Sequence, residues 1–163
     1  MGVLLLARHF YQKPGIVNGD EAPLIDGMSY QGNGVDLISL RESYVLIDFW
    51  GSWCGPCRKA NADIRSLYEE YHDKQFVDGR HFHVFSIGIE TDSAAWIQAI
   101  ESDKLFWPHH ISTMNRFDSE WAKAYGVRNI PATFLVDPRG IVIGVNSDDM
   151  EIRNILNKRI KYD

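Results

Sequence analysis

The chain has 163 residues, with 17 Lys and Arg against 22 Asp and Glu, and its formal net charge is −5 with histidine counted as neutral. Hydrophobic residues make up 45% and charged residues 24% of the chain, which is ordinary for one soluble globular domain and excludes a disordered chain, a collagen-like repeat and a coiled coil. There is no basic stripe for nucleic acid, no apolar run near the ~20 residues that span a bilayer, and too few cysteines for a disulfide scaffold or a four-thiolate zinc site.

The first 17 residues are interpreted as an N-terminal tail or a remnant left by cloning. Their only apolar stretch, residues 3–7, is too short for the core of a signal peptide, and Arg8 ends it at once. Two interpretations stay open: an ordinary N-terminal strand or tail, and a boundary at which an export signal or an upstream domain has been removed. Residues 18–163 are expected to form one domain, because no linker, repeat or low-complexity tract interrupts them.

The first half of the domain predicts a hairpin, a buried strand and a long helix. Frequent glycines and prolines break residues 14–43 into short apolar pieces, which is typical of a loop followed by a β-hairpin. Residues 44–50 form a continuous apolar run with one acid, as expected of a strand that is buried on both faces. Apolar residues then recur with helical spacing over residues 60–71, and Pro56 suits the first turn of that helix.

The second half alternates strands and helices. Strands are expected at residues 83–89, 133–136 and 141–143. Helices are expected from about Ser93, over residues 116–125 and at the C-terminus, where apolar residues recur with helical spacing from Ile152 to Ile160. Gly126 is placed to end the second of these helices, and Asp148 or Asp149 to cap the last. Residues 137–140 read Asp-Pro-Arg-Gly, the preference of a type I turn, and indicate an antiparallel hairpin. This order of elements predicts an α/β fold with a mixed sheet and helices on both faces.

Both cysteines lie between the buried strand and the long helix, in the sequence Trp53-Cys54-Gly55-Pro56-Cys57. Cys54 is therefore placed at the helix N-terminus, where free N–H groups and the helix dipole stabilise a thiolate. Cys57 lies one turn inside, close enough for a disulfide and more shielded from solvent. The pair predicts thiol–disulfide exchange in which Cys54 attacks a substrate disulfide and Cys57 resolves the mixed disulfide.

Other uses of two cysteines fit this sequence less well. A structural disulfide would close only a four-residue ring and remove little entropy from the unfolded chain. Haem attachment needs a histidine after the second cysteine, where this chain has Arg58, and a zinc site needs two further ligands that no second motif supplies. Two alternatives are kept: a copper or zinc carrier that uses the pair, and a thiol peroxidase. A thiol peroxidase would need Thr or Ser three residues before its attacking cysteine and Pro seven residues before it, and this chain has Gly51 and Ile47 at those positions, which disfavours that activity.

Two segments resemble the signatures of the thioredoxin superfamily. Residues 46–58, LIDFWGSWCGPCR, look like the thioredoxin active-site segment, and residues 125–136, YGVRNIPATFLV, look like its second signature. The likeness covers about residues 18–160. The start at residues 18–23 and the extra helical piece between residues 91 and 109 are instead similar to the TlpA-like thiol–disulfide oxidoreductases of the AhpC/TSA-like branch. The resemblance implies a thioredoxin fold with a central mixed sheet flanked by helices, an N-terminal β-hairpin extension and a central helical insertion.

Asp48 lies six residues before Cys54, on a strand where an acid is unexpected. Burial of a carboxylate without a partner is costly, so we expect desolvation to raise the pKa of Asp48. In thioredoxins the matching acid takes the proton from the second cysteine. The resemblance therefore implies that Asp48 is the general base for Cys57, unless its side chain escapes to a loop or to water.

The substrate-binding residues are also implied by the resemblance. Ile130-Pro131 matches the cis-proline dipeptide of the family, and a cis bond would bring the backbone of Ile130 beside Cys54, where it could pair with an extended substrate peptide. Trp53 is expected to form part of an exposed docking surface together with Gly55 and Pro56. Trp50 is expected to pack in the interior instead, as are Trp96, Trp107 and Trp121.

The implied reaction needs no metal and no cofactor apart from the redox-active disulfide of Cys54 and Cys57. Its expected partners are a disulfide-containing protein substrate and an upstream thiol reductase that donates electrons, and no nucleic acid. The Gly55-Pro56 pair resembles the reducing thioredoxins, so reduction is the expected direction. A monomer is expected, and the family implies a periplasmic or cell-envelope location with a membrane tether outside this sequence, although no signal peptide is visible.

Two further features qualify this picture. TlpA-like relatives commonly have Glu three residues after the second cysteine and Pro two residues later, where this chain has Ala60 and Ala62, which weakens a specialised role in cytochrome c maturation. His109 and His110 could suggest a metal pair, but adjacent residues point apart on a regular element. We therefore expect these two histidines in a surface loop.

Overall fold

The computed structural model describes residues 15–162, so most of the predicted tail, residues 1–14, lies outside the described residues. Its strands are β1 Asp26–Met28, β2 Gly34–Asp36, β3 Tyr44–Trp50, β4 Phe82–Gly88, β5 His109–Ile111, β6 Ala132–Val136 and β7 Val142–Val145. Its helices are η1 Ile38–Leu40, α2 Gly55–Tyr71, α3 Ser93–Ser102, η2 Arg116–Asp118, α4 Glu120–Tyr125 and α5 Asp149–Asn157. Within residues 15–17, Ile16 packs against a buried hydrophobic cluster.

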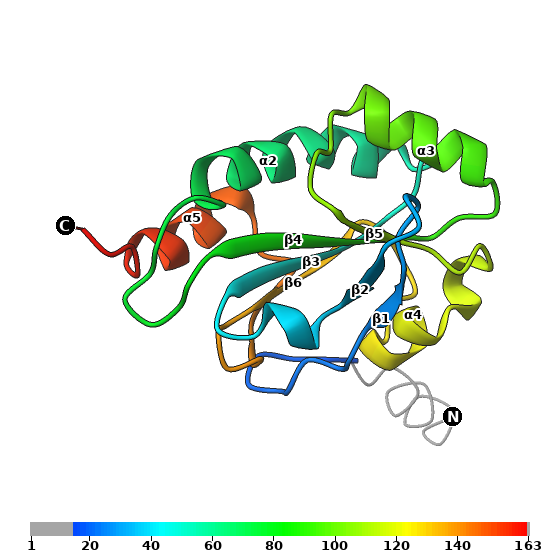
Figure 1. Cartoon of the computed structure of the whole chain (residues 1–163). Helices are drawn as coiled ribbons and strands as arrows, with labels where there is room; N and C mark the ends of the chain where they lie inside the picture. Colours follow the sequence, from blue (N-terminus) through cyan, green and yellow to red (C-terminus); the bar gives the residue numbers. More distant parts are fainter. Residues whose placement is uncertain (1–14, 163) are drawn as a thin grey trace, which may run out of the picture.

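The central sheet has five strands in the order β5-β4-β3-β6-β7. β3 runs parallel to β4 and antiparallel to β6, so the sheet is mixed, as the sequence predicts. β1 and β2 pair with each other in a separate antiparallel sheet, which confirms the hairpin extension. Helix α3 confirms the central helical insertion. Together these elements form the expected thioredoxin fold, shown in Figure 1.

Strand β3 carries a hydrophobic core on each side of the sheet. Its residues are all buried, and successive side chains point to opposite faces. Ile47 and Phe49 join the cluster beneath the hairpin and α4, while Leu46 and Trp50 join the cluster beneath α2, α3 and α5. Figure 1 shows α2 and α3 above the sheet and α4 below it. By this alternation Asp48 lies on the face that α2 covers.

The predicted ends of elements are largely confirmed. Asp148 caps α5, since its side chain accepts the N–H of Glu151. Gly126 ends α4 in the left-handed conformation, with φ of 68°. The turn after β6 is closed by the N–H of Gly140, which donates to the carbonyl of Asp137 at 2.8 Å. The helix expected over residues 116–125 is divided into η2 and α4, because the hydroxyl of Ser119 starts a new helix.

The prediction that His109 and His110 lie in a surface loop is wrong. They begin strand β5, which pairs in parallel with residues 85–87 of β4. His110 is fully buried, its ring stacks on Trp107 at 5.3 Å between centroids, and burial lowers its pKa to about 4. A strand of three residues is too short to leave a period-two pattern, so the sequence could not reveal it.

Candidate active site

Cys54 and Cys57 form a disulfide at the N-terminus of α2, with their Cα atoms 5.2 Å apart. Cys54 is the N-cap of the helix, and its sulfur accepts the N–H of Cys57 at 3.2 Å. Residue exposure is 6% for Cys54 and 1% for Cys57, so the first cysteine is the more accessible one. Pro56 lies in the first turn, where no N–H is needed. The predicted placement of both cysteines is confirmed.

Asp48 is buried in the centre of the sheet with an exposure of 1%. Neither of its carboxylate oxygens has a hydrogen-bond partner among the described residues. Desolvation raises the pKa of Asp48 to about 7, in the predicted direction. The alternative in which this side chain escapes to a loop or to water is excluded. A carboxyl group that titrates near neutral pH thus lies on the sheet face against which Cys57 packs.

The peptide bond between Ile130 and Pro131 is cis, as predicted. The carbonyl oxygen of Ile130 lies 3.9 Å from the sulfur of Cys54, so this backbone does lie beside the first cysteine. Pro131 is exposed, whereas Ile130 is half-buried and packs against both hydrophobic clusters. Residues 128–131, which we call the docking loop, therefore offer backbone groups next to the disulfide.

Trp53 presents a flat apolar surface next to Cys54, with an exposure of 47%. Its ring is held in place, because Nε1 donates to the carbonyl of Ile89 at 2.7 Å and the guanidinium of Arg116 lies 4.8 Å from the ring centroid. Trp50 is completely buried. The predicted division between an exposed and a packed tryptophan is confirmed, and Gly55 and Pro56 are also exposed.

Sequence reasoning missed Glu90, which follows β4 and is 1% exposed. Its carboxylate accepts the backbone N–H of Ser52 and, at 3.0 Å, the hydroxyl of Ser52. Burial raises the pKa of Glu90, while these hydrogen bonds act in the opposite direction. Glu90 thus fixes the turn that precedes Cys54. The available signal was an acid placed directly after the apolar run of residues 83–89.

A second missed interaction ties the first turn of α2 to the helical insertion. The guanidinium of Arg58 donates to both carboxylate oxygens of Asp103 at 2.6 and 2.8 Å, and Asn61 donates to the same group at 2.7 Å. Asp103 is the C-cap of α3. Burial raises the pKa of Asp103, but the hydrogen bonds from Arg58 and Asn61 outweigh it, so the net shift is downward.

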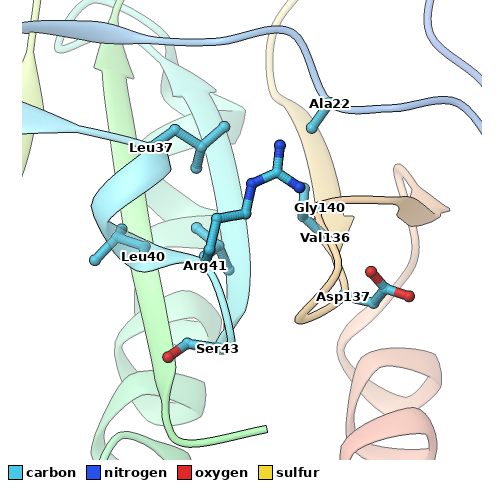
Figure 2. A pocket seen from close by; sticks show the side chains of 9 residues that line it. Ala22, Leu37, Leu40, Arg41, Ser43, Val136, Asp137 and Gly140 are labelled. Carbon is cyan, nitrogen blue, oxygen red and sulfur yellow. The ribbon is translucent and has the colours of Figure 1, made fainter. Parts of the chain in front are cut away.

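A small cavity lies near the start of β3, at the end of the strand away from Cys54. Figure 2 shows Leu37 and Leu40 on one side of it and Gly140 on the other, with the side chain of Arg41 extending between them toward Gly140. Its volume is about 10 Å³, room for one water molecule at most, so it is no small-molecule site. Within residues 15–162 no group of three or more His, Cys, Asp or Glu side chains is placed to hold a metal ion. None of the helices from α2 to α5 is long and apolar enough to cross a membrane.

Fold and site together define a thioredoxin-fold protein with a Cys-Gly-Pro-Cys disulfide at a helix N-terminus. The model of the AhpC/TSA family matches residues 18–145, and the chain belongs to this family. The thiol-disulfide oxidoreductase ResA of Bacillus thuringiensis subsp. konkukian is 27% identical over 143 residues, which cover 88% of this chain and 77% of that protein. ResA of Bacillus subtilis is 25% identical over 150 residues, which cover 92% of this chain and 78% of the relative.

Solved structures agree with this assignment. The thioredoxin domain of a thiol-disulfide oxidoreductase from Bacteroides vulgatus superposes with a TM-score of 0.76 at 27% identity, covering 88% of this chain and 97% of that one. A thiol-disulfide oxidoreductase from Bacteroides fragilis gives a TM-score of 0.74 at 27% identity, covering 85% and 98% of the two chains. Thiol–disulfide exchange is the chemistry that the site supports, and neither metal carriage nor peroxidase activity is favoured.

Proposed function

We propose that this protein reduces disulfides in other proteins by dithiol exchange. The proposal rests on one observation: a Cys54–Cys57 disulfide at the N-terminus of α2 lies next to the backbone of Ile130. The same sulfur that the helix terminus stabilises as a thiolate is thus the one that a docked peptide would meet. The similarity to proteins named thiol-disulfide oxidoreductases supports the same chemistry.

The reduced form of the protein starts the reaction. The thiolate of Cys54 attacks one sulfur of the substrate disulfide, and the other substrate sulfur leaves as a thiolate that takes a proton from water. A mixed disulfide then joins Cys54 to the substrate. Asp48, as carboxylate, removes the proton from Cys57, and the Cys57 thiolate attacks the sulfur of Cys54. The second substrate sulfur leaves as a thiolate and takes up, through water, the proton that Asp48 removed, and the protein holds the Cys54–Cys57 disulfide after transferring two electrons.

A second thiol protein must return the disulfide to the dithiol state. We propose an upstream thiol reductase as this electron donor, with no cofactor other than the two cysteines. The exposed ring of Trp53 and the segments at Gly55-Pro56 and Ile130-Pro131 would hold the substrate. We also propose that the protein acts as a monomer in the cell envelope, in keeping with its resemblance to TlpA-like proteins.

Reduction of insulin by dithiothreitol, followed by the turbidity of the released B chain, tests this function. The protein should accelerate the reaction, whereas Cys54→Ser should abolish the acceleration. Cys57→Ser that has been reduced and freed of dithiothreitol before it is mixed with insulin should stall at the mixed disulfide, which a gel without reductant shows as a covalent adduct that Cys54→Ser cannot form. Absence of acceleration, or an adduct formed through Cys57, would contradict the proposal.

The reduction potential of the pair sets the direction of electron flow. Equilibration with glutathione or dithiothreitol, followed by tryptophan fluorescence, should place it near the reducing end of the range of roughly −270 to −120 mV known for such proteins. A potential near −120 mV would instead assign an oxidase or isomerase role to the same site.

A further inference from the structure

Three exposed cations lie around the active site without a carboxylate partner. Arg116, Arg128 and Lys59 are all exposed, and none of them forms an ion pair within residues 15–162. Arg58, by contrast, is already held by Asp103. We call Arg116, Arg128 and Lys59 the basic rim.

Two members of the basic rim lie beside the substrate-facing segments, Arg116 through a contact with Trp53 and Arg128 through its position in the chain. The guanidinium of Arg116 lies over the ring of Trp53, 4.8 Å from its centroid. Trp53 directly precedes Cys54 in the chain. Arg128 belongs to the docking loop and precedes Ile130 by two residues, so their Cα atoms are at most about 7 Å apart. Ile130 in turn lies 3.9 Å from the sulfur of Cys54 through its carbonyl oxygen.

Lys59 extends the basic rim along the helix. It follows Pro56 by three residues and Gly55 by four, and residues at these spacings are neighbours on one helix face. Each of the three segments expected to hold the substrate therefore has a cation beside it: Arg116 at Trp53, Lys59 at the first turn of α2, and Arg128 in the docking loop.

Three acids near these segments are held by other groups, whereas Asp63, four residues after Lys59 on α2, is exposed and forms no ion pair among the described residues. Glu90 is buried and bound to Ser52, and Asp103 is bound to Arg58. Asp92 is exposed, but its carboxylate accepts the N–H of Ala95 at the start of α3 at 3.1 Å. The three cations of the basic rim thus form no ion pair within residues 15–162, on a chain whose net charge is −5. With a screening length of about 8 Å at physiological salt, a docked peptide responds to these nearby charges more than to distant acids.

We propose that the preferred substrates are protein disulfides whose reactive cysteine is flanked by Asp or Glu, an inference that rests on the proposed function. In an extended peptide, residues up to four positions from the cysteine lie within about 14 Å of it, which is within reach of the basic rim. Two of its three cations are arginines, whose planar guanidinium pairs with carboxylates in a bidentate manner. The acidic flanks pair with the basic rim while the cysteine faces Cys54.

Two synthetic peptides test this preference. Each has one internal disulfide and the same length, and its cysteines are flanked by three Asp in one peptide and by three Lys in the other. The reduced protein is mixed with each peptide, the reaction is quenched with acid, and the released dithiol is measured by chromatography. The rate of each peptide with dithiothreitol, which attacks as a thiolate as Cys54 does, corrects for intrinsic reactivity and for the attraction of the peptide to the thiolate itself.

We expect the corrected second-order rate constant to be about tenfold higher for the acidic peptide at 20 mM salt, and the ratio to fall below about threefold at 500 mM. Arg116→Gln with Arg128→Gln should reduce the low-salt ratio to about twofold. Arg116→Lys with Arg128→Lys keeps both charges and should retain at least half of the preference. Lys158→Gln with Lys161→Gln removes the same charge from exposed positions at and beyond the end of α5 and should leave the ratio unchanged.

Equal corrected rates for the two peptides, or a preference that persists in the Arg116→Gln, Arg128→Gln protein, would overturn the inference while leaving the reductase function intact. A protein that reduces neither peptide, when dithiothreitol reduces both, would overturn the proposed function and this inference with it. The two failures are therefore separable in one experiment.

Discussion

Replacement of Asp48 by asparagine should stabilise the oxidised protein, and the gain should depend on pH. The carboxyl group is buried and has no hydrogen-bond partner among the described residues. Its pKa is raised from 3.8 to about 7 by desolvation. Since the unfolded chain ionises Asp48 at the lower pKa, folding becomes less favourable as the pH rises from about 4 to about 7.

The size of the effect follows from this shift. About three pKa units at 1.36 kcal/mol each give a cost of about 4 kcal/mol for Asp48 at pH 8. At pH 4.5 the folded protein holds the carboxyl group neutral, and the same relation gives a cost of only about 1 kcal/mol. Asparagine has nearly the same shape and no charge, so Asp48→Asn should exceed the wild type in free energy of unfolding by about these amounts.

Urea unfolding of the oxidised wild type and variant at pH 4.5 and pH 8 measures the difference. Comparison at each pH cancels the titration of all other groups. Asp63→Asn, on the exposed side of α2, serves as the control and should stay within about 0.5 kcal/mol of the wild type at both pH values. A difference for Asp48→Asn that is absent at pH 8, or equal at the two pH values, would refute the argument from burial.

Three further predictions concern a residue beside the site, the end of α4 and a strand of the sheet. Glu90→Ala should cost about 1–3 kcal/mol in unfolding by urea, because it leaves the N–H of Ser52 without its acceptor; a loss no larger than that of Glu90→Gln would contradict this role. Gly126→Ala should lower the unfolding free energy by about 1 kcal/mol or more, since φ is 68° and a Cβ would come within 2.5 Å of the Gly15 Cα; an unchanged urea midpoint would count against it. The pKa of His110 is lowered to about 4, so the wild type should lose about 3 kcal/mol of unfolding free energy as the pH falls from about 6.5 to about 4, and His110→Phe should lack this part of the loss; the same pH dependence in both proteins would contradict the prediction.

The sequence predicted the parts of the site that depend on local order along the chain. Cys54 and Cys57 lie at the start of α2 because a buried strand, a glycine-containing turn and a helical stripe follow each other directly. Asp48 could be recognised as buried because every neighbour in residues 44–50 is apolar. These signals need no knowledge of which distant segments meet, and the fold class follows from the same order of elements.

The parts that sequence reasoning missed depend on contacts between distant segments. The carboxylate of Glu90 meets Ser52 from 38 positions away, and the contact between Arg58 and Asp103 spans 45 positions. Neither pairing leaves a periodic signal, because any exposed loop can carry such residues. Strand β5 was missed for a related reason: its three residues are recognisable as a strand only through their partners in β4.

Ile130 packs against the hydrophobic clusters on both sides of the sheet while its carbonyl faces Cys54. A repacking of either cluster therefore shifts the group that a docked peptide would meet, even when the change lies far from both cysteines. Interiors are close-packed and pass small displacements on rather than absorb them. Substitutions in either of the two hydrophobic clusters can therefore change substrate preference without altering the catalytic cysteines, both in natural evolution and in laboratory selection.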